Sequence, residues 1–131
     1  MTAPLGGDDR TVMVVDDSDD IRELICMQLR GMGYRVVEAA NGEEAVELVR
    51  RAHPGLILMD LSMPVMEGYE ATRRIKALPE LGGVPVVAVS AFCDSHSIRK
   101  ALEAGCIDCV SKPIDFAAID SVVSRHLPAH K

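Results

Sequence analysis

Three carboxylates stand directly after runs of apolar residues that are predicted to be buried strands. Asp60 follows Leu56–Met59, and the pair Asp16 and Asp17 follows Thr11–Val15. Parallel strands bring their carboxyl ends to one edge of a sheet, so these acids are expected to lie close together. Closely packed carboxylates repel one another and favour a bound cation. Oxygen ligands with neither His nor Cys among them suit Mg²⁺ better than Zn²⁺.

Two further polar residues are predicted to reach the same edge of the sheet. Ser90 ends the apolar run Pro85–Val89, and Lys112 follows the short strand predicted at Ile107–Ser111. A hard cation, an ammonium group and a hydroxyl could each hold one oxygen of a transferring phosphoryl group. The carboxylate of Asp60 could then attack phosphorus and form an aspartyl phosphate. No glycine-rich phosphate loop follows the first strand, so the phosphoryl group is expected to arrive on a donor rather than on a bound nucleotide.

The elements that must position these groups alternate as strand and helix, five times along the chain. Such alternation predicts an α/β fold, a doubly wound five-stranded parallel sheet of order 2-1-3-4-5 with five helices on its two faces. Ile98, Ala101, Leu102 and Gly105 are expected to share one face of the fourth helix, and Phe116 of the fifth helix is expected to point inward. The predicted strands are 11–15, 34–39, 56–60, 85–90 and 107–111, and helices are predicted to follow residues 18, 41, 68, 94 and 115.

Length and composition suit a single domain with one aliphatic core, because the chain has 131 residues and is 48% hydrophobic. We expect residues 1–10 to form a flexible N-terminal lead-in, 11–127 the domain and 128–131 a tail. A formal net charge of −6 argues against direct binding of nucleic acid. No apolar run approaches the ~20 residues of a membrane span. The first ten residues do not form a signal peptide, so a cytoplasmic location is expected.

The chain has four cysteines, Cys26, Cys93, Cys106 and Cys109. Their even number indicates disulfides only in secreted proteins, and no secretion signal is present. Cys106 and Cys109 have C-x-x-C spacing, but neither a second pair of zinc ligands nor a reactive helix-start placement accompanies them. Small buried thiols are therefore the preferred interpretation. A redox or metal role for Cys106 and Cys109 is the alternative.

Four motifs resemble the receiver domains of two-component response regulators, such as the single-domain chemotaxis regulators. They occur in the order and with the spacing of that family, and the likeness covers nearly all of residues 11–127. The resemblance implies the flavodoxin-like form of the predicted fold and a phosphoprotein that acts in phosphorelay signal transduction. The motifs are Val14–Ser18, Met59–Gly68, Val89–Ala91 and Ser111–Pro113.

The resemblance implies that Mg²⁺ is held by residues of the first two motifs. Asp17 and Asp60 would ligate the ion directly, together with the backbone carbonyl of Ser62. Asp16 would contribute as well, often through a water molecule. The metal site implied for this chain therefore comprises Asp16, Asp17, Asp60 and Ser62.

The resemblance also implies the phosphoryl chemistry. Asp60 would be the phosphoacceptor and would take its group from a phosphohistidine of a sensor histidine kinase or a histidine phosphotransfer protein. Lys112 would pair with Asp60 and then with the phosphoryl group, and Ser90 would turn toward the new phosphoryl oxygen. The Lys112–Pro113 peptide bond is typically cis in the family. The domain would not be an enzyme beyond its own phosphorylation and dephosphorylation, and it would signal to a downstream protein target or an output domain in the same chain.

One position departs from the family pattern. Three residues before Lys112, receivers usually carry Tyr or Phe, and this chain has Cys109. A cysteine is too small to fill the space of a ring. The signal is therefore expected to pass through the loop from Ser90 to Ser95 and through the packing of the fourth helix.

Three alternatives remain: another setting for a receiver, and two other functions. The chain could be a receiver module from a hybrid histidine kinase or a larger regulator, because the sequence around Asp60 is common there. A Mg²⁺-dependent phosphatase with an aspartyl nucleophile fits less well, since such enzymes usually have a second Asp at the position of Ser62. A flavin-binding electron carrier would need a Ser/Thr/Gly-rich phosphate loop and aromatic residues around the flavin, and the sequence has neither.

Overall fold

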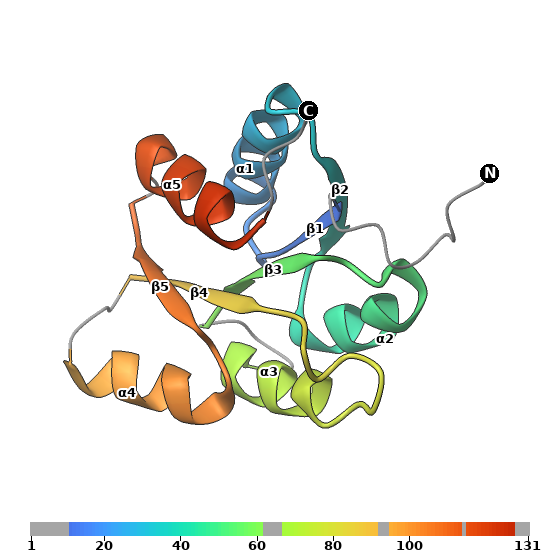
Figure 1. Ribbon diagram of the computed structural model, residues 1–131. Coiled ribbons are helices and arrows are strands. Elements are labelled where there is room, and N and C mark those ends of the chain that lie inside the picture. Colours follow the sequence, from blue (N-terminus) through green and yellow to red (C-terminus); the bar gives the residue numbers. More distant parts are fainter. Residues whose placement is uncertain (1–10, 62–66, 92–94, 114, 128–131) are drawn as a thin grey trace.

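Five parallel strands form a central sheet of order β2-β1-β3-β4-β5 in the computed structural model (Figure 1). The structure describes residues 11–61, 67–91, 95–113 and 115–127. The predicted fold class and strand order are confirmed, including the position of the more polar second strand at an edge. The strands are β1 (Thr11–Val15), β2 (Arg35–Ala39), β3 (Leu56–Asp60), β4 (Val86–Ser90) and β5 (Asp108–Ser111).

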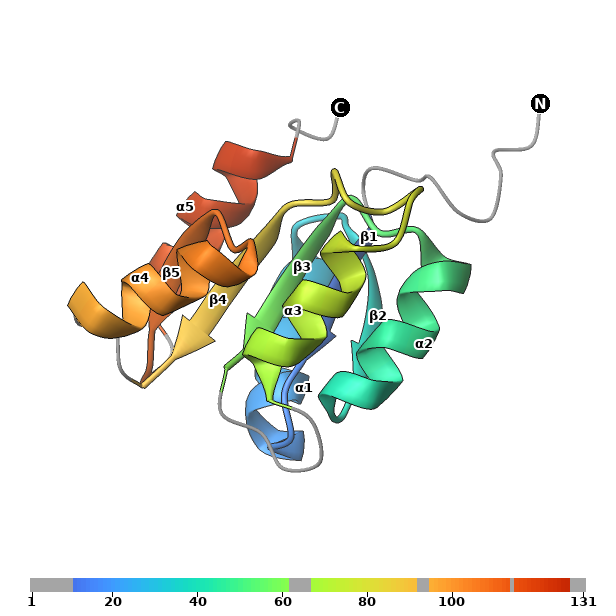
Figure 2. The same ribbon diagram turned by 90° about the horizontal axis from the view of Figure 1, so that it is seen from below.

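Helices cover both faces of the sheet (Figure 2). The first and last helices lie on one face, and the three others lie on the opposite face. Within the described residues no helix is long and apolar enough to cross a lipid bilayer. The helices are α1 (Asp19–Gly31), α2 (Gly42–Ala52), α3 (Gly68–Lys76), α4 (Ser95–Ala104) and α5 (Phe116–His126).

Two clusters of apolar side chains bury the two faces of the sheet. Val12 and Val14 pack on the side of α1 and α5, whereas Met13 and Val15 pack on the side of α2, α3 and α4. This alternation explains why a strand buried on both faces is a continuous apolar run in the sequence. All five residues of β3 are buried, so packing fixes the position of its last residue, Asp60.

Side-chain caps begin three of the helices at the predicted residues. The Ser18 hydroxyl accepts a hydrogen bond from Ile21 N at 3.3 Å, and Asn41 Oδ1 accepts one from Glu44 N at 2.9 Å. Asp115 Oδ1 accepts from Ala117 N at 2.9 Å. Each cap satisfies a backbone N–H that has no partner within its own helix.

Three large apolar side chains of α4 and α5 are exposed, and one of them, Phe116, was predicted to point inward. Ile98 and Leu102 of α4 are 36% and 53% exposed, and Phe116 of α5 is 48% exposed. The helix α4 lies at the β5 edge of the sheet beside α3, and Ala101 and Ala104 form its buried positions (Figure 2). Phe116 is the first residue of α5, whereas the buried residues of that helix lie further along it.

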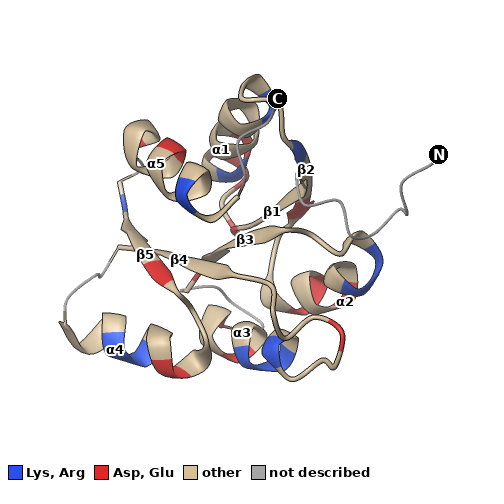
Figure 3. Ribbon diagram, viewed as in Figure 1, with Lys and Arg blue, Asp and Glu red and all other residues tan. Residues whose placement is uncertain are grey.

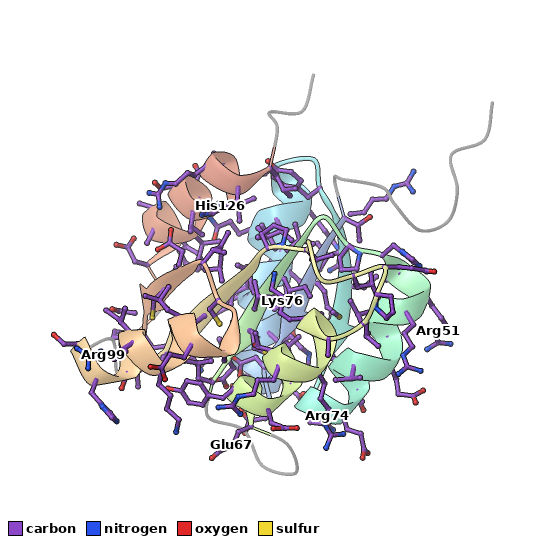
Figure 4. The ribbon with its side chains drawn as sticks, turned by 60° about the horizontal axis from the view of Figure 1, so that its bottom comes forward. Arg51, Glu67, Arg74, Lys76, Arg99 and His126 are labelled. Carbon is purple, nitrogen blue, oxygen red and sulfur yellow. The ribbon has the colours of Figure 1, made fainter. Side chains whose placement is uncertain are left out.

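The end of α3 is fixed to the loop that leads into β4. The ammonium group of Lys76, labelled in Figure 4, donates to the carbonyl oxygens of Gly82 at 3.1 Å and Val84 at 2.5 Å. Burial lowers the pKa of Lys76, and the nearby Cys106 opposes this effect. These bonds fix the start of the strand that carries Ser90 at its other end.

Candidate functional site

The carboxyl ends of β1 and β3 place the first two acids side by side. Val15 pairs with Met59 in the register of these strands, and Asp16 and Asp60 follow directly in each chain segment. The backbone N–H of Asp16 donates to the carbonyl of Ala39 at 3.1 Å, which extends the pairing of β1 with β2 by one residue. Asp16 and Asp60 are only 1% and 2% exposed, so both carboxylates need a partner.

Asp17 joins these two residues in an acidic cluster. Asp16, Asp17 and Asp60 each offer a carboxylate oxygen, and these three oxygens lie within 4.8 Å of one another. Asp17 is exposed, which leaves one side of the cluster open to solvent. Three convergent carboxylates, two of them buried, form a donor set that fits a hard divalent cation such as Mg²⁺. Ser62, the fourth ligand expected from the sequence, lies outside the described residues.

Lys112 is the cation of the cluster. Its Nζ lies 3.2 Å from Oδ2 of Asp16 and 3.3 Å from Oδ2 of Asp60. Burial on its own would lower the pKa of Lys112, but the two carboxylates raise that pKa above its ordinary value. Lys112 is therefore an ammonium ion at neutral pH, and it offsets part of the repulsion between the buried acids.

The backbone after β5 brings Lys112 to this edge. The N–H of Lys112 donates to the carbonyl of Ser90 at 2.8 Å, and the Lys112–Pro113 peptide bond is cis as expected. Ser90 itself is 4% exposed and pairs with Ser111 across β4 and β5. The structure thus brings Lys112 and Ser90 to the edge of the sheet that carries the acids.

Gly68, the last residue of the motif Met59–Gly68, also supports the site. A Cβ at this position would overlap the backbone oxygen of Asp60 and lie 2.8 Å from Cα of Leu61. The N–H of Gly68 also donates to the carbonyl of Leu61 at 3.2 Å. The first turn of α3, which follows Glu67 in Figure 4, therefore packs directly on the backbone of the acidic residue. Only glycine permits so close an approach.

Arg22 is a second residue at the site that was not predicted from the sequence. Its guanidinium group donates from Nη1 to the backbone carbonyl of Asp16 at 2.8 Å. The sequence signal was the spacing: Arg22 follows the helix cap Ser18 by one helical turn, so its side chain can reach back past the start of α1.

The cysteines occupy apolar surroundings. Cys26 and Cys106 are buried free thiols, and Cys109 is half-buried. Burial raises the pKa of Cys26 to about 11, and burial likewise raises the pKa of Cys106, which hydrogen bonds to Thr72. These surroundings favour structural thiols over reactive ones. Cys93 lies outside the described residues.

Cys109 lines a hollow in the position where receivers usually carry a ring. The hollow has a volume of about 270 Å³ and lies between α4 and β5. Ile98 and Leu102, the exposed large apolar side chains of α4, border it together with Ile107. The small thiol therefore leaves open a space between this helix and the edge strand.

Comparisons with known proteins agree with this geometry. A family model described as the response regulator receiver domain matches residues 12–124. The polar-differentiation response regulator DivK of Brucella ovis is 33% identical over 118 residues, which cover 90% of this chain and 96% of that protein.

Solved structures of receiver domains are also similar. One is the receiver domain of the sensor histidine kinase PA1611 from Pseudomonas aeruginosa, which is described with a magnesium ion in its active site cleft. It is 33% identical to this chain, with a TM-score of 0.83, and the match covers 90% of this chain and 97% of that chain. A Saccharomyces cerevisiae co-crystal structure of the histidine phosphotransfer protein Ypd1 and the receiver domain of Ssk1 gives 29% identity and a TM-score of 0.84, over 90% of this chain and 88% of that chain. Because the family model and these relatives span almost the whole chain, the chain belongs to the receiver domains of response regulators in two-component signalling.

Proposed function

We propose that this protein is a phosphoacceptor switch in which Asp60 takes a phosphoryl group from a phosphohistidine of a donor protein. The observation that carries the proposal is the contact between Lys112 and Asp60, two charged groups that meet at 3.3 Å where β3 ends. A carboxylate with 2% exposure beside an ammonium group is placed for chemistry on a group that carries several charged oxygens. Receiver domains are signalling switches rather than enzymes with an external substrate.

Asp16, Asp17, Asp60 and the backbone carbonyl of Ser62 would hold Mg²⁺ at this edge. The ion, when bound, supplies positive charge against the phosphoryl oxygens. The convergence of the three carboxylates supports this assignment, and the magnesium ion described for the PA1611 receiver supports it by similarity.

Asp60 acts as the nucleophile in the proposed transfer. One of its carboxylate oxygens forms a bond to phosphorus while the bond from phosphorus to the donor's imidazole nitrogen breaks, and the imidazole keeps that electron pair. Lys112 then holds a phosphoryl oxygen in place of the Asp60 oxygen that it contacts in the structure. The Ser90 hydroxyl donates to another phosphoryl oxygen. Water later cleaves the acyl phosphate. The only reactions that the protein catalyses are then its own phosphorylation and dephosphorylation.

The net charge and the distribution of basic residues favour proteins over nucleic acid as binding partners. Within the described residues, Lys and Arg are spread over β2 and over α1, α2, α3, α4 and α5 (Figure 3). With a net charge of −6, such a surface does not favour a phosphate backbone. We propose a sensor histidine kinase or a histidine phosphotransfer protein as the donor, in line with the Ypd1–Ssk1 complex, and a protein target or an output domain in the same chain as the receiver of the signal.

We further propose that residues 11–127 form the receiver unit, with 1–10 as a lead-in and 128–131 as a tail, because the family model matches residues 12–124. Free thiols at the buried Cys26 and Cys106 suit a reducing compartment, which supports a cytoplasmic location. Similarity both to DivK and to a receiver domain of a histidine kinase fits a separate regulator as well as a module of a larger protein.

Phosphorylation by a small donor with a phosphorus–nitrogen bond tests this function. Phosphoramidate and Mg²⁺ are added to the protein, and its intact mass is followed with time. We expect one added phosphoryl group on the natural protein and on Asp120→Asn, an exposed control, and none on Asp60→Asn. Chelation of Mg²⁺ with EDTA should prevent the addition. Equal addition to Asp60→Asn would refute the proposal.

A further inference from the structure

Arg22 connects three segments that meet beside the acidic cluster. Its Nη1 donates to the carbonyl oxygen of Asp16 at 2.8 Å, its Nε donates to Oε1 of Glu38 at 3.1 Å, and its Nη2 donates to Oδ1 of Asp19 at 2.6 Å. These acceptors belong to the end of β1, to β2 and to the start of α1. The side chain of Arg22 is 15% exposed, whereas its acid partners Glu38 and Asp19 are 39% and 85% exposed, so the bond to the Asp16 carbonyl is the more buried part of the network.

Contacts hold every polar atom of Asp16 in place. Its carboxylate accepts from Ser18 N at 2.9 Å through Oδ1 and faces Lys112 through Oδ2. Its carbonyl oxygen, the acceptor of the Arg22 bond, belongs to the peptide group that joins Asp16 to Asp17. Arg22 therefore fixes the plane of the peptide between two acids of the cluster.

Asp17 depends on that peptide for its direction. Its side chain is exposed, and within the described part of the chain no residue donates a hydrogen bond to its carboxylate. The backbone on either side of Asp17 must then aim the carboxylate at Asp60. The Arg22 side chain holds this backbone at the Asp16 carbonyl, together with the bonds from Ser18 N to the Asp16 carboxylate and from Asp16 N to the Ala39 carbonyl.

We propose that Arg22 is a positioning residue of the metal site. It holds the Asp16–Asp17 peptide so that the carboxylate of Asp17 stays close enough to the other two carboxylates to ligate the same ion. The inference rests on the proposed Mg²⁺ site and adds a residue that touches neither the ion nor the phosphoryl group. Supporting contacts of this kind affect metal affinity by about 10- to 100-fold in other metal sites.

The charge of Arg22 acts in the opposite sense to its positioning effect. A cation near three carboxylates weakens the binding of another cation, so removal of Arg22 would strengthen Mg²⁺ binding if charge were decisive. The guanidinium group, however, is itself paired with Glu38 and Asp19. Because these acids offset its charge, we expect the loss of geometry to outweigh the electrostatic gain.

Mg²⁺ titration by isothermal calorimetry at constant ionic strength tests this role. Arg22→Ala is expected to weaken Mg²⁺ binding by about tenfold. Arg30→Ala is the matched control, because Arg30 also contacts Glu38, at 3.5 Å, and its loss removes the same charge without touching Asp16. The Mg²⁺ affinity of Arg30→Ala should stay within about twofold of that of the natural protein. Circular dichroism establishes that each variant is folded.

Two more variants separate positioning from general stabilisation. Glu38→Gln removes an ion-pair partner of Arg22 but leaves the bond to the Asp16 carbonyl possible, so stability should fall slightly while Mg²⁺ affinity is kept. Arg22→Lys keeps the positive charge but loses the planar set of N–H donors. Its Mg²⁺ affinity should therefore lie between those of the natural protein and Arg22→Ala.

The outcomes distinguish this inference from the proposed function. If the natural protein binds no Mg²⁺, the proposed metal site and the role of Arg22 are both wrong. If the natural protein binds Mg²⁺ and Arg22→Ala binds it as well as Arg30→Ala does, only the positioning role is wrong. Tighter binding by Arg22→Ala would also overturn that role, because charge would then be decisive.

Discussion

The ammonium group of Lys112 lies 3.3 Å from Oδ2 of Asp60, and it is 19% exposed beside a carboxylate that is almost fully buried. Replacement of Lys112 by Met would leave Asp16 and Asp60 buried without their cation. We expect a loss of about 3 kcal/mol in the free energy of unfolding in EDTA, the usual cost of breaking a buried ion pair. Urea denaturation at neutral pH measures it.

Mg²⁺ should recover part of this loss, since a bound cation replaces the missing charge. The midpoint of thermal unfolding should therefore rise more with Mg²⁺ in Lys112→Met than in the natural protein. Arg99→Met removes an exposed cation of α4 and serves as the control. Equal stabilities of Lys112→Met and the natural protein in EDTA would contradict the structural role of the pair.

Gly68 should not tolerate a side chain. Its added Cβ in Gly68→Ala would overlap the Asp60 backbone, so α3 must shift away from β3. We expect a destabilisation of about 2–3 kcal/mol, typical of overpacking in a closely packed region. Gly31→Ala is the control, because nothing lies within 4 Å of a Cβ at that position. Chemical denaturation compares the two variants, and similar midpoints would show that the close approach is not required.

Asp108 should contribute to stability in a pH-dependent way. Burial alone would raise its pKa, but hydrogen bonds from Cys109 N and His126 and the charge of Arg125 lower that pKa below its ordinary value. The stabilisation is then present above about pH 4, the ordinary value for Asp, and is lost as the pH falls through the lower folded-state pKa.

Asp108→Asn should thus be less stable than the natural protein by about 0.5–1 kcal/mol at neutral pH, a modest effect because water screens the pair. The difference should shrink below about pH 4. Unfolding free energies from pH 7 to 3 measure it, with Asp120→Asn as an exposed control. A difference that grows on acidification would show that the sign is wrong.

The thiols should differ in reactivity. Cys26 and Cys106 are buried with raised pKa values, so iodoacetamide should not modify them in the native protein. The half-buried Cys109 should react before them. Peptide mass spectrometry after timed alkylation assigns each position. Rapid formation of a Cys106–Cys109 disulfide under mild oxidation would favour the redox alternative instead.

Much of the site could be predicted because it depends on strand ends. A run such as Leu56–Met59 is apolar without interruption only when both faces of its strand are covered, and the following Asp60 must then lie at the sheet edge. The same reasoning applied to Asp16 and Lys112, and both lie beside Asp60 in the structure.

Other features depend on tertiary placement and could not be predicted. The bond from Arg22 to the Asp16 carbonyl requires the exact direction of α1 relative to β1. The exposure of Leu102 and Phe116 depends on how far neighbouring elements extend beside α4 and α5, which helical periodicity does not report. The contact of Gly68 with the Asp60 backbone likewise follows from the path of α3.

Chemical identification of the phosphorylated side chain tests the central claim most directly. The protein is treated with phosphoramidate and Mg²⁺ and then with borohydride, which reduces an aspartyl phosphate to homoserine. Tandem mass spectrometry then locates the product. We predict homoserine at position 60 and at no other aspartate, dependent on Mg²⁺. Homoserine at another position, or a phosphoryl group that resists borohydride on a residue such as Ser90, would contradict the assignment of Asp60 as the phosphoacceptor.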